Sequence, residues 1–161
     1  MSWRERDKVI NSAIIVTLVF FDAISKFYFS SSLSDGSVVN IVPGFRFILV
    51  HNYGAGFGFL ASAGGWQQIL FISITLIFVG YMGWKIFSGR PEDFCSNLGF
   101  AFICGGALGN FIDRIKQGYV TDFIDIYFDK WHWPVFNLAD TAITIGAVIL
   151  IYDIFFYRKK S

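Results

Sequence analysis

GYVTDFIDIYFDKWHWPVFNLAD, residues 118–140, separates the third and fourth long apolar runs of this sequence. The stretch contains four carboxylates, Asp122, Asp125, Asp129 and Asp140. Asp140 differs from the other three because the apolar residues that follow it are numerous enough to cross a bilayer. A carboxylate at the mouth of a membrane helix costs free energy unless it has a partner or a chemical task. The stretch therefore predicts a polar segment at a membrane surface, in which Asp140 pairs with one of the upstream acids.

The overall composition is typical of an integral membrane protein. Of the 161 residues, 55% are hydrophobic and 20% are aromatic, whereas only 16% are charged; soluble domains carry about 25% charged residues. The length suits one compact unit, so we expect a single domain over residues 1–161. The net charge of +1 gives no bulk positive field, and we therefore expect no nucleic-acid partner.

The apolar runs predict a mainly α fold with four transmembrane helices. A helix of about 20 residues, rising about 1.5 Å per residue, crosses a hydrocarbon core of about 30 Å. Four runs have about this length: residues 9–29, 67–87, 94–112 and 135–157. Within the third run, Gly105 and Gly109 have the spacing of small residues that lets helices pack closely in lipid.

The segment between the first two runs combines a strand pattern with a glycine-rich loop. Residues 45–50 alternate partly between apolar and polar, as a half-buried strand would, and the Pro43-Gly44 pair before them is typical of a turn. HNYGAGFGF, residues 51–59, predicts a shaped loop, because glycine allows close backbone approach and unusual dihedral angles. A loop that only connects two spans is the alternative. Three of its residues are candidates for substrate contact: Asn52, Gly54 and Phe57.

The distribution of lysine and arginine predicts the orientation in the membrane. Four spans place both termini on one side. That side, with the turn between the second and third spans, carries eight Lys and Arg residues, and the other side carries five over much longer segments. Since cytoplasmic loops carry the excess of positive charge, we expect both termini in the cytoplasm and residues 30–65 and 115–134 outside.

Asp122 and Asp140 are the central candidates for catalysis. Two carboxylates that share a site do not both ionise cheaply, so one keeps its proton. The pair then offers a base that activates water and an acid that protonates a leaving amine. The alternatives are that Asp140 stabilises a helix start and that Asp122 is a solvated loop acid. We expect Asp125 and Asp129 to be solvated or interfacial.

Polar residues near these acids have helical spacing. Asn137 precedes Asp140 by three positions, and Asn110 precedes Arg114 by four, so each pair shares a helix face. We expect Asn110, Arg114 and Asn137 to orient the acids or a substrate carbonyl. Helix capping and a snorkelling arginine are the alternative. Asp113, beside Arg114, is expected to form a structural hydrogen bond or ion pair.

Asp22 and Lys26 lie four residues apart in the outer part of the first span. An ion pair between them neutralises two charges that are costly in a membrane, so we expect both side chains to support the fold. The sequence contains only two histidines, too few for a convincing zinc site, and we expect neither a metal nor a cofactor.

Five motifs, in this order along the chain, match a known family. They are DAISK (22–26), NYGAGF (52–57), GNFIDR (109–114), VTDF (120–123) and FNLAD (136–140). On these residues the chain resembles the lipoprotein signal peptidase family of bacteria, also called signal peptidase II. The resemblance maps the family's catalytic aspartates onto Asp122 and Asp140. Ala23 and Gly56 depart from the residues that the family often has at these positions.

The resemblance implies an aspartic endopeptidase of the bacterial inner membrane that needs no metal. It implies cleavage of diacylglyceryl-modified prolipoproteins before the lipidated cysteine of the lipobox, and release of the signal peptide. It also implies a small extracytoplasmic β-sheet around residues 38–50 that cradles the substrate. Membrane lipid and globomycin-type peptide inhibitors are the other implied partners.

A proton-coupled carrier that uses paired acids is the alternative function. Such a carrier predicts acids near the middle of the membrane and inverted repeats. In this sequence the acids cluster at one end of the spans, and no repeat is evident.

Overall fold

The computed structural model describes residues 1–55, 59–88 and 93–157. Within these ranges the chain forms four long helices and a four-stranded sheet. The helices are α1 (Trp3–Ser32), α2 (Trp66–Ser88), α3 (Phe94–Gln117) and α4 (Leu138–Tyr152), and α4 continues into a π-helical turn, η3 (Asp153–Tyr157). The strands are β1 (Val38–Val42), β2 (Phe45–Asn52), β3 (Val120–Phe128) and β4 (Trp131–His132). This architecture confirms the predicted fold class.

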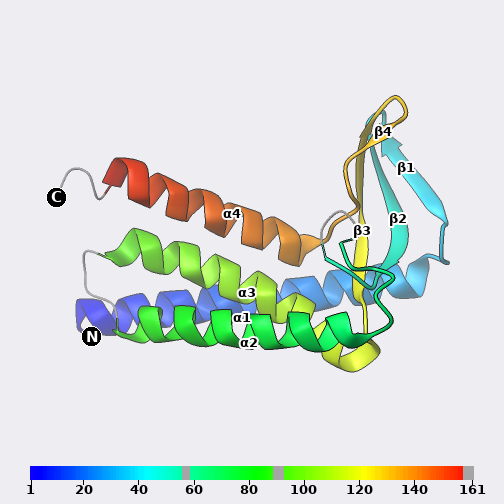
Figure 1. The fold of residues 1–161 in the computed structure, drawn as a ribbon. Coiled ribbons are helices and arrows are strands. Elements are labelled where there is room, and N and C mark those ends of the chain that lie inside the picture. The colour runs from blue at the N-terminus through cyan, green and yellow to red at the C-terminus, as the bar shows by residue number, and fades with distance from the viewer. Residues whose placement is uncertain (56–58, 89–92, 158–161) are drawn as a thin grey trace.

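The four helices lie side by side, and the sheet stands at one end of them (Figure 1). Each is long and apolar enough to cross a membrane, α4 together with its continuation to Phe156. The start of α1 and the end of η3 lie at the end opposite the sheet. Helix α3 is the central helix, because it packs against α1, α2 and α4. The polar outer segments and the sheet therefore meet at one mouth of the bundle.

Capping residues explain why α1 and α4 begin, and α3 ends, at other residues than the apolar runs predict. Helix α1 begins at Trp3 and not near residue 9, because Ser2 and Glu5 form a capping box. Helix α4 begins at Leu138 and not at Val135, because Asn137 caps it. Helix α3 extends beyond residue 112 and ends at Gly118, whose φ of 78° is the left-handed conformation that terminates helices.

Small residues on α3 allow close contact with α1, as the spacing of Gly105 and Gly109 predicts. A Cβ atom at Gly105 would lie 2.9 Å from the Leu18 side chain, and one at Gly109 would lie 2.4 Å from Asp22 Oδ2. Neither position has room for a larger residue without a shift of its neighbour. The close approach brings the Asp22 carboxylate against α3, directly below the sheet.

The sheet is antiparallel, with strand order β1-β2-β3-β4. It is anchored on the outer end of α1, where Phe29 stacks on Phe123 of β3 with ring centroids 4.2 Å apart. Strand β2 confirms the predicted strand and extends it to Asn52. In the register of β2 with β3, Val50 lies opposite Asp122. The sheet thus holds Asp122 above the start of α4.

Candidate active site

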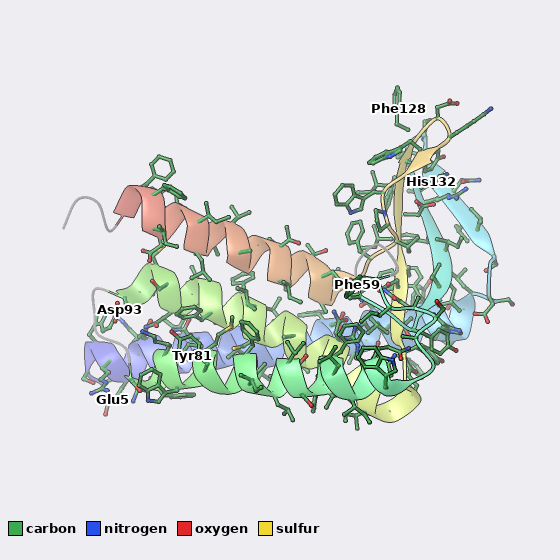
Figure 2. All side chains as sticks on the ribbon, in the orientation of Figure 1. Glu5, Phe59, Tyr81, Asp93, Phe128 and His132 are labelled. Carbon is green, nitrogen blue, oxygen red and sulfur yellow. The ribbon has the colours of Figure 1, made fainter. Side chains whose placement is uncertain are left out.

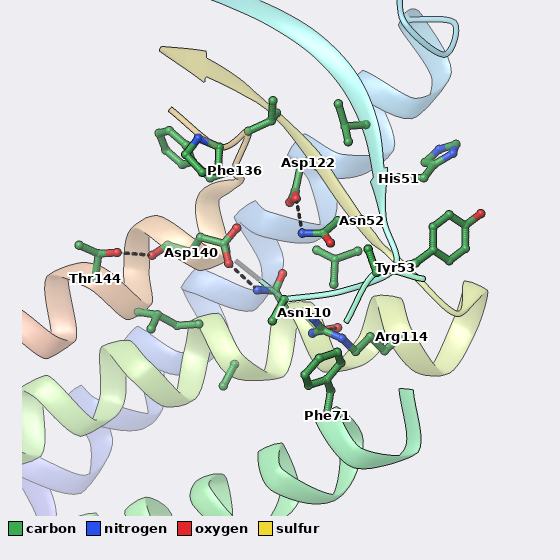
Figure 3. A pocket seen from close by; sticks show the side chains of 18 of the residues that line it. His51, Asn52, Tyr53, Phe71, Asn110, Arg114, Asp122, Phe136, Asp140 and Thr144 are labelled. Atoms are coloured by element: carbon green, nitrogen blue, oxygen red, sulfur yellow. Dashed lines mark hydrogen bonds between the residues drawn. The ribbon is translucent and has the colours of Figure 1, made fainter. Parts of the chain in front are cut away.

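Asp122 of β3 and Asp140 of α4 line one cavity of about 910 Å³ at the outer end of the bundle (Figure 3). Asp122 is 2% exposed, and Asp140 is half-buried. Apolar side chains of α2 and α4, among them Phe71 and Ile143, form another part of the cavity wall. The structure therefore brings together the two acids that the sequence singles out, 18 positions apart, where the helices meet the sheet.

The cap of α4 fixes the position of Asp140. The Asn137 side chain accepts a hydrogen bond of 2.9 Å from the Asp140 backbone N–H, and Asp140 Oδ2 accepts one of 3.2 Å from the Asn137 backbone N–H. A carboxylate in the first turn also interacts favourably with the helix dipole. Asp140 therefore stabilises the start of α4, as the alternative interpretation predicts, and its carboxylate also lines the cavity.

Three asparagine side chains present their NH₂ groups to the two acids. Asn52 donates to Asp122 Oδ2 at 3.0 Å and Asn137 donates to Asp122 Oδ1 at 2.7 Å. Asn110 donates to Asp140 Oδ1 at 2.8 Å. Each amide oxygen is held by a group that only donates: the Gly54 backbone N–H for Asn52, the Asp140 backbone N–H for Asn137 and the ammonium group of Lys26 for Asn110. These donors fix all three amides with their NH₂ groups toward the acids.

A buried ionic cluster lies directly behind these amides. Lys26 Nζ lies 2.7 Å from Asp22 Oδ2 and 3.1 Å from Asp113 Oδ2, which confirms the predicted Asp22–Lys26 ion pair. Asp22 Oδ1 accepts a hydrogen bond from the Ala139 backbone N–H, and Asp113 Oδ2 accepts one from the Thr121 backbone N–H. The cluster of Asp22, Lys26 and Asp113 therefore joins α1 and α3 to the segments that carry the two acids.

The surroundings of Asp122 favour its protonated form. Burial, and to a smaller extent the nearby carboxylate of Asp140, raise the pKa of Asp122 from 3.8 to about 7. The hydrogen bonds from Asn52 and Asn137 and the charge of Lys26 act in the opposite direction on this pKa. The raising effects are larger, so the pair holds a proton up to about neutral pH.

A family model described as signal peptidase (SPase) II matches residues 14–156 of this chain. The chain belongs to the signal peptidase II family. It is a membrane protease of the aspartic type that this family represents. The match includes both acids, the three amides and the buried ionic cluster.

Curated relatives have the name of this family, and solved structures of bacterial membrane enzymes have a similar fold. The lipoprotein signal peptidase of Chromobacterium violaceum is 45% identical over 143 residues, which cover 88% of each chain. That of Shewanella sp. (strain MR-4) is 45% identical over 151 residues, 91% of this chain and 87% of the relative. A bacterial membrane enzyme solved at 2.3 Å by the in meso method superposes with a TM-score of 0.81 at 28% identity, covering 90% of this chain and 87% of the other. A second such structure, at 1.9 Å, has a TM-score of 0.79.

Arg114 links the glycine-rich loop of this signal peptidase II protein to α3. Its Nη2 donates to the Gly54 carbonyl at 3.1 Å, and its guanidinium lies 5.1 Å from the centroid of the Phe71 ring. A Cβ atom at Gly54 would lie 2.4 Å from the Phe59 carbonyl oxygen, so the loop requires glycine there. Phe57, the other loop residue expected to contact substrate, lies outside the described residues.

The expectation that Asp125 is solvated is wrong. Asp125 is 1% exposed; Arg46 Nε lies 2.5 Å from its Oδ2, and His132 Nδ1 lies 2.9 Å from its Oδ1. Figure 2 shows His132 on the β3–β4 hairpin that projects beyond the outer end of α4. No local sequence pattern indicates this cluster, because Arg46 lies 79 positions from Asp125 and meets it only through strand pairing. Asp129, in contrast, is exposed, as predicted.

Among the described residues, no group of three or more His, Cys, Asp or Glu side chains is arranged to hold a metal ion.

Proposed function

We propose that Asp122 and Asp140 are the catalytic pair of a signal peptidase that removes signal peptides from diacylglyceryl-modified prolipoproteins. Cleavage occurs on the amino side of the lipidated lipobox cysteine. The observation that carries the proposal is the shared cavity, in which one carboxyl keeps its proton while a second faces the same space.

The chemistry follows from the unequal protonation of the pair. Asp122 carries the proton, so Asp140 is the base that takes a proton from water as the water oxygen attacks the scissile carbonyl carbon. Asp122 then gives its proton to the leaving nitrogen as the C–N bond breaks. The product carboxyl gains the water hydroxyl and the product amine gains the proton, so the two steps balance without a metal or a cofactor.

The position of the cavity suits a lipid-anchored substrate. Acyl chains and a signal helix hold such a substrate in the bilayer, which places the scissile bond near the membrane surface. The cavity lies between the outer ends of α2, α3 and α4 and the sheet, and we infer that this end of the bundle meets the membrane surface. Its wall combines apolar helix residues with polar residues of β2 and β3, which fits a ligand that is part lipid and part peptide. Asn52, Gly54 and Arg114 supply polar groups for the peptide part, and globomycin-type peptides would compete for the same space.

We also propose that both termini face the cytoplasm and that the acid pair faces the outer side of the bacterial inner membrane. The excess of Lys and Arg at the end with the termini supports this orientation. The carrier alternative has less support, because Asp140 lies in the first turn of α4 and not near the middle of a span.

The test is cleavage of a purified prolipoprotein by the purified protein in detergent micelles. One sample of substrate carries the diacylglyceryl group and a matched sample does not. We expect cleavage of the lipidated sample only, with the new amino terminus at the lipidated cysteine by mass spectrometry. Equal cleavage of both samples, or cleavage elsewhere, would contradict the proposed substrate. Activity that is lost on chelation and restored by zinc would contradict the metal-free mechanism.

A further inference from the structure

We propose that Lys26, beyond its ion pair with Asp22, is a positioning residue for the reaction. Through the side chain of Asn110 it orients the Asp140 carboxylate, and its charge lowers the pH above which the acid pair loses its proton. This inference rests on the proposed catalytic pair.

The contacts of Lys26 exceed what a structural ion pair requires. The side chain is 4% exposed, and its ammonium group has three N–H donors. Three acceptors surround Nζ: Asp22 Oδ2 at 2.7 Å, Asp113 Oδ2 at 3.1 Å and Asn110 Oδ1 at 2.9 Å. The carboxylates of Asp22 and Asp113 would neutralise the Lys26 charge and join α1 to α3 even without the contact to Asn110. The bond to Asn110 is the one that leads toward the cavity.

The third contact determines what Asn110 offers to Asp140. Lysine has no acceptor, so only the amide oxygen of Asn110 can face it. The carboxamide is planar, and its NH₂ group therefore faces the other way, where it donates to Asp140 Oδ1 at 2.8 Å. Without Lys26, the group that remains on the amide oxygen, among the residues that the structure describes, is the NH₂ of Asn137, at 3.1 Å. A cation on the oxygen also polarises the amide and strengthens the bond to Asp140.

The charge of Lys26 acts on the same pair. Several titratable or charged groups face the cavity or the Lys26 cluster from the elements packed around it: Asp22 of α1, His51 of β2, Asp113 and Arg114 of α3, Asp122 of β3, His132 of β4 and Asp140 of α4. Among the described residues, Lys26 is a buried cation near the two acids and Arg114 is a half-buried one. Removing Lys26 removes one positive charge and leaves Asp22 and Asp113 without this partner. The pair then keeps its proton to higher pH.

The Asp22→Asn variant is a control that removes a negative charge, whereas Lys26→Met removes a positive one. It removes the same ion pair but keeps the Lys26 ammonium bonded to Asn110, and it deletes a negative charge. A role confined to holding the helices together predicts the same behaviour for Asp22→Asn and Lys26→Met. The positioning role predicts that they differ in pH dependence.

The experiment measures kcat and KM against pH for the wild type, Lys26→Met, Asp22→Asn and the double variant Asp22→Asn/Lys26→Met, with the folded fraction of each determined by thermal unfolding. The double variant removes both members of the ion pair, so it leaves no uncompensated Asp22 charge if Lys26→Met alone does not fold. The substrate is the lipidated prolipoprotein described above. Absence of cleavage by the wild type would contradict the proposed function itself, whereas the comparisons among variants test Lys26.

For Lys26→Met we expect kcat to fall by about tenfold to a hundredfold with little change in KM, because one oriented donor to the reacting pair loses its support. The alkaline limb of its pH profile should move upward by about 0.5 to 1 unit, less than the shift from a charge in direct contact. Asp22→Asn should reduce the folded fraction without an upward shift. The proposal is overturned if folded Lys26→Met, or the double variant in its place, keeps the wild-type limb and kcat, or if neither variant folds.

Discussion

Two buried polar networks lie at opposite ends of the same bundle. The outer network contains the acid pair, three asparagines and the cluster of Asp22, Lys26 and Asp113. The inner network, near the termini, contains Asp7, Asn11 and Asn97. Both hold carboxylates that are nearly inaccessible to solvent, and in both these carboxylates accept hydrogen bonds from asparagine NH₂ groups. Burial and hydrogen bonding therefore do not by themselves distinguish an active site from a polar network that only holds helices together.

The difference lies in the arrangement of the acids. Asp7 accepts one bond from Asn11 and one from Asn97, each of 3.0 Å, and so joins α1 to α3. A hollow of about 310 Å³ adjoins it, so a cavity is not the distinguishing feature either. Of the two networks, the outer one places a second carboxylate against the same space, and burial together with that carboxylate raises the pKa of Asp122 to about 7. A proton held near neutral pH beside a second carboxylate is what hydrolysis requires.

The sharpest test of this difference replaces the outer acids. Asp122→Asn and Asp140→Asn should each lower kcat by on the order of 10⁴-fold, as loss of an essential catalytic group does. Asp129→Asn, an exposed acid in the same hairpin, is the control and should keep at least a tenth of the activity, about 1.4 kcal/mol at most. Normal cleavage by either of the first two variants would contradict the assignment.

Asp122→Asn should also change how stability depends on pH. The pKa of Asp122 rises from 3.8 in the unfolded chain to about 7 in the folded protein. The folded state therefore binds this proton more tightly, and the resulting stabilisation is complete below about pH 4 and is lost as the pH rises through about 7. Above that pH the wild type retains a buried charge that the variant lacks. We expect the variant to unfold at a higher temperature than the wild type at alkaline pH.

A smaller effect is expected from the amide between the two acids. Asn137→Ala removes both the cap of α4 and the donor to Asp122, and should lower kcat by about a hundredfold. Asn137→Asp keeps an acceptor for the cap but removes the NH₂ donor. If Asn137→Asp matches the wild type in kcat, the donor to Asp122 has no role in the reaction.

Asp125→Asn tests whether burial alone makes an acid of β3 essential for activity. The variant weakens the contacts to Arg46 and His132 and should lower the thermal stability of the sheet. Its folded fraction should keep at least a tenth of the wild-type activity, a loss of about 1.4 kcal/mol at most. A folded but inactive Asp125→Asn protein would transfer the catalytic role from Asp122 to Asp125.

The smallest effect on catalysis is expected at the inner network. Asp7→Asn replaces an acceptor of two amide bonds and should lower the free energy of unfolding by about 1–3 kcal/mol. The kcat of its folded fraction should stay within about threefold of the wild type, roughly 0.7 kcal/mol. A large loss of kcat at unchanged stability would show that the two networks do not differ in the proposed way.

Local sequence patterns predict much of this molecule. Apolar runs of about 20 residues predict the four helices, since a bilayer requires that length. The i, i+4 spacing of Asp22 and Lys26 predicts their ion pair, which lies within one helix. Asp140 stands out in the sequence because a carboxylate at the start of a membrane span costs free energy unless it has a partner or a chemical task.

Contacts between distant segments are not predictable in the same way. Lys26 and Asn110 lie 84 positions apart, and no local pattern indicates that the lysine fixes the asparagine amide. Asp125 looks like a loop acid until strand pairing brings Arg46 opposite it. The start of α4 at Leu138 depends on a cap, which hydropathy does not detect.

The proton held by the acid pair can be observed directly by infrared difference spectroscopy. We expect the wild type in detergent to show a protonated-carboxyl C=O band at pH 6 that disappears as the pH rises through about 7, the pKa of Asp122. The band should be absent from Asp122→Asn and unchanged in Asp7→Asn. A wild type without this band at pH 6, or a band that persists in Asp122→Asn, would contradict the claim that Asp122 and Asp140 share a proton.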